Sequence, residues 1–129
     1  MSYWQEHDII EKTIEVLAAV PTVPGHAFGR PYVTAYQLAI GLARQFPDTV
    51  AAYGQPLGGA GTGVANTSAQ YVAQQLSRRI AADPAYPVEG AFLGNQEVES
   101  IRCRAPDGQV VISSLTGSGF DLSMFRLRD

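Results

Sequence analysis

The stretch that decides the fold class is Glu97–Leu115, with the sequence EVESIRCRAPDGQVVISSL. Two β-like runs flank Ala105–Gly108, and the order Pro, Asp, Gly within that short segment is typical of a turn. We therefore expect strands over 97–104 and 109–115, joined as a hairpin. Because side chains alternate between the two faces of a strand, the arginines of the first run should lie opposite its cysteine.

The part of the chain before this hairpin is helical in pattern. Apolar residues recur at the spacing of one helix face, and prolines or glycines separate the runs. The patterns Thr34–Gln37 and Thr67–Gln70 are capping boxes, in which a Thr hydroxyl and a Gln side chain satisfy free amides at a helix start. The predicted helices span 3–19, 34–46, 47–53 (a short turn) and 68–82.

Two further β-like pieces lie near the hairpin. Apolar and polar residues alternate over Phe120–Met124, and Gly90–Gly94 is a candidate short extended segment. Helices first and strands last indicate an α+β fold: a single domain over 1–129, with three main helices followed by a small antiparallel hairpin or sheet. This element order resembles that of winged-helix domains, which implies that the third main helix reads a duplex and that Ala105–Gly108 is the tip of the wing.

Composition and charge limit the possible partners. The chain has 129 residues, 46% hydrophobic, with nine basic against twelve acidic side chains and a net charge of −3. No apolar run approaches the roughly 18 residues of a membrane span, and the acidic N-terminus does not read as a secretory signal, so we expect a cytoplasmic protein without membrane contact. Cys103 is the one cysteine, and the histidines show no metal-ligand spacing, so neither a metal site nor a cofactor is expected.

The glycine-rich stretch Leu57–Gln70, LGGAGTGVANTSAQ, precedes the third main helix. It lacks the third glycine of a dinucleotide fingerprint and the lysine of a P-loop. Two interpretations stay open: an anion site at the helix start, because free amides and the helix dipole attract negative charge, or a connector. The residues concerned are Gly61, Gly63, Thr67 and Ser68.

Our leading functional interpretation is a non-enzymatic binding or regulatory module. Its contact surface would combine the outer face of the third main helix with the arginines of the hairpin, all suited to polar recognition. The partner would be a protein or DNA, and the acidic net charge counts against DNA. A homo-oligomer is a further expectation. The predicted contact residues are Gln74, Gln75, Arg78, Arg79, Arg102 and Arg104.

The alternative from another class is a small enzyme. The proline-rich connector over 20–32 contains His26 and Arg30, which could provide a base and a cation. If this loop met the Gly61–Ser68 loop, within one chain or at a dimer interface, the two would form a site. The sequence leaves open whether there is any catalysis.

Overall fold

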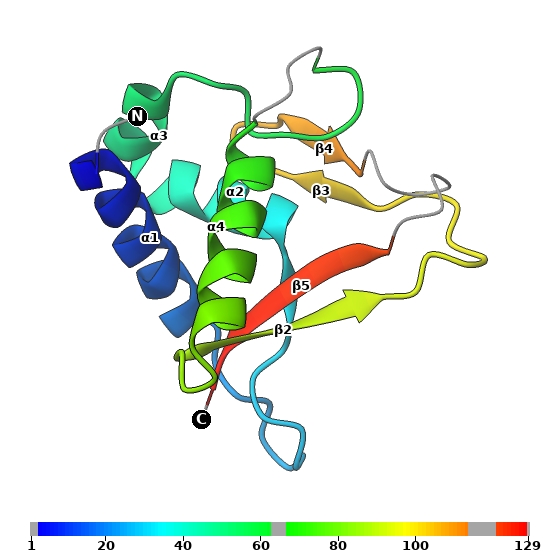
Figure 1. Ribbon diagram of the computed structural model, residues 1–129. Helices are drawn as coiled ribbons and strands as arrows, with labels where there is room; N and C mark the ends of the chain where they lie inside the picture. The colour runs from blue at the N-terminus through cyan, green and yellow to red at the C-terminus, as the bar shows by residue number, and fades with distance from the viewer. Residues whose placement is uncertain (1–2, 63–66, 114–120, 129) are drawn as a thin grey trace.

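The computed structural model describes residues 3–62, 67–113 and 121–128 and confirms the α+β class (Figure 1). Helices form one layer, and strands from the second half of the chain form most of the other. In chain order the elements are α1 (Tyr3–Ala18), β1 (Val33–Thr34), α2 (Ala35–Gln45), α3 (Pro47–Tyr53), α4 (Ser68–Ala82), β2 (Val88–Leu93), β3 (Arg102–Arg104), β4 (Val110–Ile112) and β5 (Leu122–Leu127). No helix among the described residues is long and apolar enough to cross a membrane.

The helices form where local signals place them. At the start of α2 the amide of Gln37 donates to Thr34 Oγ1 (3.2 Å) and the amide of Thr34 donates to Gln37 Oε1 (2.7 Å), so the predicted capping box is confirmed. Thr67 caps α4 by accepting from the amide of Gln70, but the Gln70 side chain does not return the bond, so the second predicted capping box is only half formed. The apolar faces meet in one core, whose most deeply buried large side chains are Leu17, Leu38, Leu42, Val72, Leu76, Val88, Val111 and Phe125.

The main sheet has three antiparallel strands in the order β1-β5-β2. The short strand expected around Phe120–Met124 is instead β5, the central strand. It pairs with β2 in a register that runs from Val88 opposite Leu127 to Leu93 opposite Leu122. Phe125 is fully buried beneath the helices, and burial of this kind favours a central strand position.

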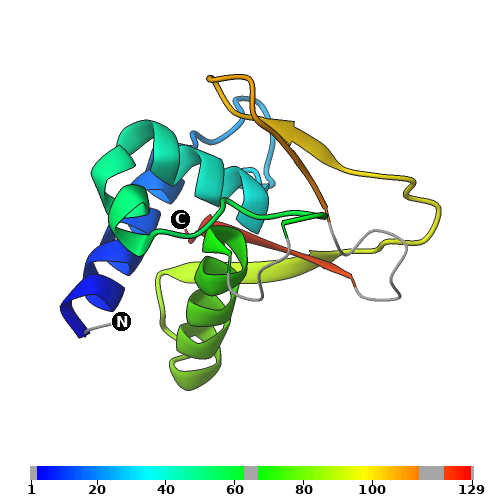
Figure 2. The same ribbon diagram turned by 90° about the horizontal axis from the view of Figure 1, so that it is seen from above.

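The predicted hairpin is present. Among the described residues, Arg102–Arg104 pairs with Val110–Ile112 as a separate two-stranded sheet, so the first strand is shorter than the expected 97–104. Residues 114–115 of the second expected strand lie outside the described residues. In Figure 2 this hairpin lies on one side of β2 and β5, while α4 lies on the other. The expected wing tip, Ala105–Gly108, therefore does not lie beside the outer face of α4, as one continuous duplex-binding surface would require.

Candidate functional site

The connector over 20–32 contains no helix or strand, as its prolines predict, yet arginine side chains fix it at both ends. At its start, Arg30 Nη1 donates to the carbonyl oxygens of Ala18, the last residue of α1, and of Val20, each at 3.0 Å. At its far end, Arg126 Nη1 of β5 donates to the carbonyl oxygens of Phe28 (2.6 Å) and Arg30 (3.0 Å). Bonds from a charged donor are among the stronger hydrogen bonds in proteins, so this loop is held in one shape.

Arg126 is itself held on several sides. Its Nε donates to Glu89 Oε1 at 2.6 Å, and its guanidinium carbon lies 4.3 Å from the centre of the Tyr32 ring. Glu89 also accepts from Arg128 at 3.2 Å. The Arg126 and Glu89 side chains are mostly buried, which makes this ion pair stronger than one fully in water. The guanidinium therefore joins the sheet to the loop.

The loop presents aromatic side chains to solvent. Phe28 is 80% exposed and Val23 45% exposed. The His26 ring stacks on Phe28, with 5.7 Å between ring centres and 21° between planes. Beside them lies a groove of about 560 Å³ that Tyr32 and Arg126 also line. We call Val23, His26, Phe28 and this groove the proline-loop surface. Aromatic side chains held at the surface are typical of binding sites.

The predicted contact residues of α4 divide into two groups. Gln74 and Arg78 are exposed, one turn apart. The expectation that Gln75 lies on the outer face is wrong: it is 6% exposed, and its Nε2 donates to Glu6 of α1 at 3.4 Å. Half-buried Arg79 donates to Gln75 Oε1, also at 3.4 Å. Gln75 therefore connects α4 to α1, and Arg79 is bonded to it within α4.

The hairpin arginines are exposed but lie away from α4. Arg102 and Arg104 share the outer face of β3, and Figure 2 places that hairpin across the sheet from α4. The hairpin tip instead lines one wall of a groove of about 520 Å³. Arg44 of α2 and Gln55, just after α3, line the opposite side. Arg78 and the hairpin arginines therefore do not share one continuous face.

The helix start after the glycine stretch has no vacant amides for an anion. The first three amides of α4 donate to oxygen atoms of the chain itself: Ser68 to Pro56 O (2.9 Å), Ala69 to Leu57 O (2.8 Å) and Gln70 to Thr67 Oγ1 (3.2 Å). Anion sites at helix starts depend on such amides being free. This geometry favours the connector interpretation. Gly63 lies outside the described residues.

Earlier glycines of the stretch permit close packing. Gly59 has a φ of 93°, and a Cβ there would lie 2.5 Å from the carbonyl oxygen of Ile112 in β4. The next residue, Ala60, donates its amide to that same oxygen at 2.8 Å. Gly61 also has a positive φ but no atom near a would-be Cβ. The glycines therefore let the loop run against the hairpin.

The two loops of the alternative enzyme site lie far apart within one chain. The loop over 20–32 is at the bottom of Figure 1, and the start of α4 lies toward the top. The groove beside His26 has no lining residue from the described part of the glycine stretch. A shared site would need a second copy of the chain.

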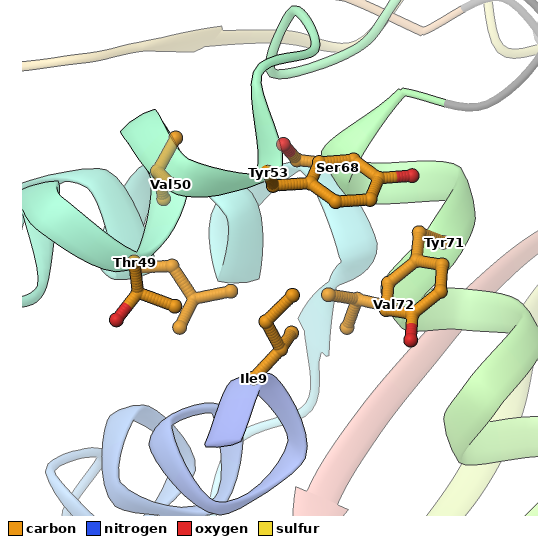
Figure 3. A pocket seen from close by; sticks show the side chains of 8 residues that line it. Ile9, Thr49, Val50, Tyr53, Ser68, Tyr71 and Val72 are labelled. Atoms are coloured by element: carbon orange, nitrogen blue, oxygen red, sulfur yellow. The ribbon is translucent and has the colours of Figure 1, made fainter. Parts of the chain in front are cut away.

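A small cleft opens where α1, α3 and α4 meet (Figure 3). Ile9 approaches from α1, Thr49, Val50 and Tyr53 from α3, and Tyr71 from α4. Its volume is about 10 Å³, room for about one water molecule. The buried hydroxyl of Ser68 borders it and has no hydrogen-bond partner in the described structure. The cleft is too small for a substrate.

Cys103 is not activated as a nucleophile. Burial raises the pKa of its thiol, with a smaller opposing effect from a hydrogen bond involving Thr34. A raised pKa lowers the fraction of reactive thiolate at neutral pH. This environment fits the expected structural role. The described residues contain no group of three His, Cys, Asp or Glu side chains that could hold a metal ion.

Comparison with known proteins adds no relative to this description. No family model, curated protein or solved structure matches the chain.

Proposed function

We propose that this chain is a non-enzymatic binding module that contacts a partner protein through the proline-loop surface. The observation that carries the proposal is Phe28. Its ring is 80% exposed, while its carbonyl oxygen is bonded to a side chain of the central strand. An exposed aromatic ring on a backbone that is fixed in this way is typical of a protein-binding surface.

Fixation lowers the entropy cost of binding. Ordering a flexible loop on association consumes part of the free energy that its contacts provide. Here Arg30 and Arg126 order the loop before a partner arrives. Complete burial of a Phe side chain contributes about 1.5–3 kcal/mol, enough to make Phe28 a central contact of the interface.

The test is a peptide-display selection against the purified chain, with counter-selection against Phe28→Ala. We expect peptides that bind the wild type in the micromolar range and lose about tenfold or more in affinity on Phe28→Ala. Phe92→Ala is the matched control, because Phe92 is also strongly exposed but lies on β2. Peptides that ignore both substitutions, or a selection that enriches none, would contradict the proposal.

DNA is the second candidate partner, and exposed Gln74 and Arg78 on α4 support it. Amide and guanidinium groups one turn apart suit base edges or phosphates. Fluorescence anisotropy with random duplex DNA at two salt concentrations tests this candidate. Salt-sensitive binding that Arg78→Ala removes and Phe28→Ala leaves intact would favour DNA over the protein partner.

A further inference from the structure

Both arginines that line the groove of the proline-loop surface already serve the loop itself. Arg126 pairs with Glu89 and donates to two carbonyl oxygens of the loop. Arg30 donates to two carbonyl oxygens at the start of the loop. Recognition of phosphorylated or acidic segments depends on arginines that are available to bind them. The surface therefore fits an uncharged segment better than an anionic one.

The backbone of the loop is poorly suited to strand addition. That mode of binding needs a row of free amide and carbonyl groups along an extended edge. Residues 20–32 form no strand. The carbonyl oxygens of Phe28 and Arg30 already accept from Arg126, and Pro24 and Pro31 have no amide hydrogen to donate. A partner would therefore contact this surface mainly through its side chains.

The side chains of the surface combine flat apolar faces with hydrogen-bond donors. The exposed Phe28 ring, on which His26 stacks, and the Tyr32 ring, which lies against the Arg126 guanidinium, both line the groove. The Tyr32 hydroxyl and the His26 ring nitrogens form no hydrogen bond within the part of the chain that the structure describes. An O–H and a ring N–H are therefore available to acceptors on a ligand.

We propose that the partner binds here through a proline-rich segment in the polyproline II conformation, an inference that rests on the proposed function. This helix has no internal hydrogen bonds, so its carbonyl oxygens can accept from Tyr32 and His26. Its proline rings are apolar and pack on aromatic faces such as that of Phe28. Proline carries no charge and no amide hydrogen, so the segment needs neither a free arginine nor a strand edge.

An amphipathic α-helix is the main competing ligand, and it complements the surface less well. Its carbonyl groups are bonded within the helix, so it offers no backbone acceptor to the Tyr32 hydroxyl or the His26 ring. Covering these donors without giving them a partner would be unfavourable. A polyproline II segment is also largely formed before it binds, and Arg30 and Arg126 fix the loop. Both sides then lose little conformational entropy on association.

NMR titration of the isotope-labelled chain measures both the affinity and the location of binding. The probe is an end-blocked oligoproline of about twelve residues, roughly four turns, compared with an uncharged helical peptide of equal length made of alanine, glutamine and leucine. We expect the oligoproline to bind about tenfold more tightly or better, and to shift resonances within 22–32 and at Arg126.

Three variants separate the ring from the donor. Phe28→Ala should weaken oligoproline binding about tenfold or more, because it removes the most exposed ring. Tyr32→Phe keeps the ring against Arg126 but removes one donor, and should weaken binding about three- to tenfold. Phe92→Ala is the matched control, because this exposed phenylalanine lies on β2. It should leave the affinity unchanged.

The outcomes distinguish this inference from the proposed function. If oligoproline shifts no resonance of the loop while displayed peptides bind in a Phe28-dependent way, the proline-rich ligand is wrong and the binding module stands. If neither kind of peptide binds, both proposals fall. Oligoproline binding that Phe28→Ala leaves unchanged, or equal affinity for the helical peptide, would also overturn the inference.

Discussion

Replacement of Arg126 by alanine should release the proline-rich loop and destabilise the whole chain. The side chain donates to two loop carbonyl oxygens, at 2.6 and 3.0 Å, and to the carboxylate of Glu89 at 2.6 Å. It also covers one face of the Tyr32 ring. Arg128, directly after β5, is the matched comparison, because it donates to Glu89 of β2 and to the carbonyl oxygen of Tyr86 just before β2.

The expected cost follows from burial and the number of bonds. A hydrogen bond to a charged group contributes about 1.5–3 kcal/mol when it is buried. Arg126 is 21% exposed, but one of its loop bonds is exposed and the other only part-buried, so the two together contribute about 2 kcal/mol, less than two buried bonds would. In the Arg126→Ala variant Glu89 still has Arg128 as a partner, so the broken Arg126–Glu89 ion pair adds little to the loss of stability. Arg128 is 42% exposed, and its removal should cost about 1 kcal/mol or less.

Urea unfolding followed by circular dichroism measures both free energies of unfolding. Limited proteolysis of the native chain, mapped by mass spectrometry, reports on the loop directly. We expect Arg126→Ala to be cut within 20–32 well before the wild type or Arg128→Ala. Equal losses of stability in the two variants, with an unchanged cleavage pattern, would show that Arg126 does not hold the loop.

Two further predictions concern the glycine stretch and a buried tyrosine. Gly59→Ala should lower the free energy of unfolding by about 3 kcal/mol, because the new Cβ meets the carbonyl oxygen of Ile112 at a residue with positive φ. Gly61→Ala should lower it by only about 1 kcal/mol, because a Cβ there meets nothing within 4 Å. Denaturant unfolding of the two variants measures the difference. Burial first, and then the nearby Glu6 carboxylate, raises the pKa of Tyr71 from 10.0 to about 12. The unfolded chain therefore loses this proton first, and stability should fall as the pH rises from about 10 to about 12. Unfolding curves of wild type and Tyr71→Phe across that range measure the effect, and an identical pH dependence of the two would refute it.

Local sequence was enough for the helices. Thr34, with Gln37 three residues later, marks the start of α2 because a capping box involves only neighbouring residues. Thr67 and Pro47 similarly mark the starts of α4 and α3. The turn at Ala105–Gly108 was equally readable. Each of these signals acts within one turn of the chain, so no knowledge of the rest of the fold was needed.

The order of the strands in the sheet could not be predicted from local sequence patterns. The β5 segment had the alternation of a strand, but its central place depends on pairing with both β1 and β2. Gln75 shows the same limit for a helix face. Its polar side chain suggested an exposed position, whereas the structure buries it between α1 and α4, with hydrogen bonds to Glu6 and Arg79. A polar side chain is buried when a partner is present, and the partner is distant in sequence.

By itself, then, the sequence determined the α+β class, the helix starts and the absence of regular structure in the proline-rich loop. Tertiary structure alone decided the candidate surfaces. Phe28 is held at the surface by Arg126, 98 residues away, and the position of β2 depends on its pairing with β5. Caps and turns are local interactions, whereas strand pairing and side-chain clamps join distant residues, and their geometry exists only once the chain has folded.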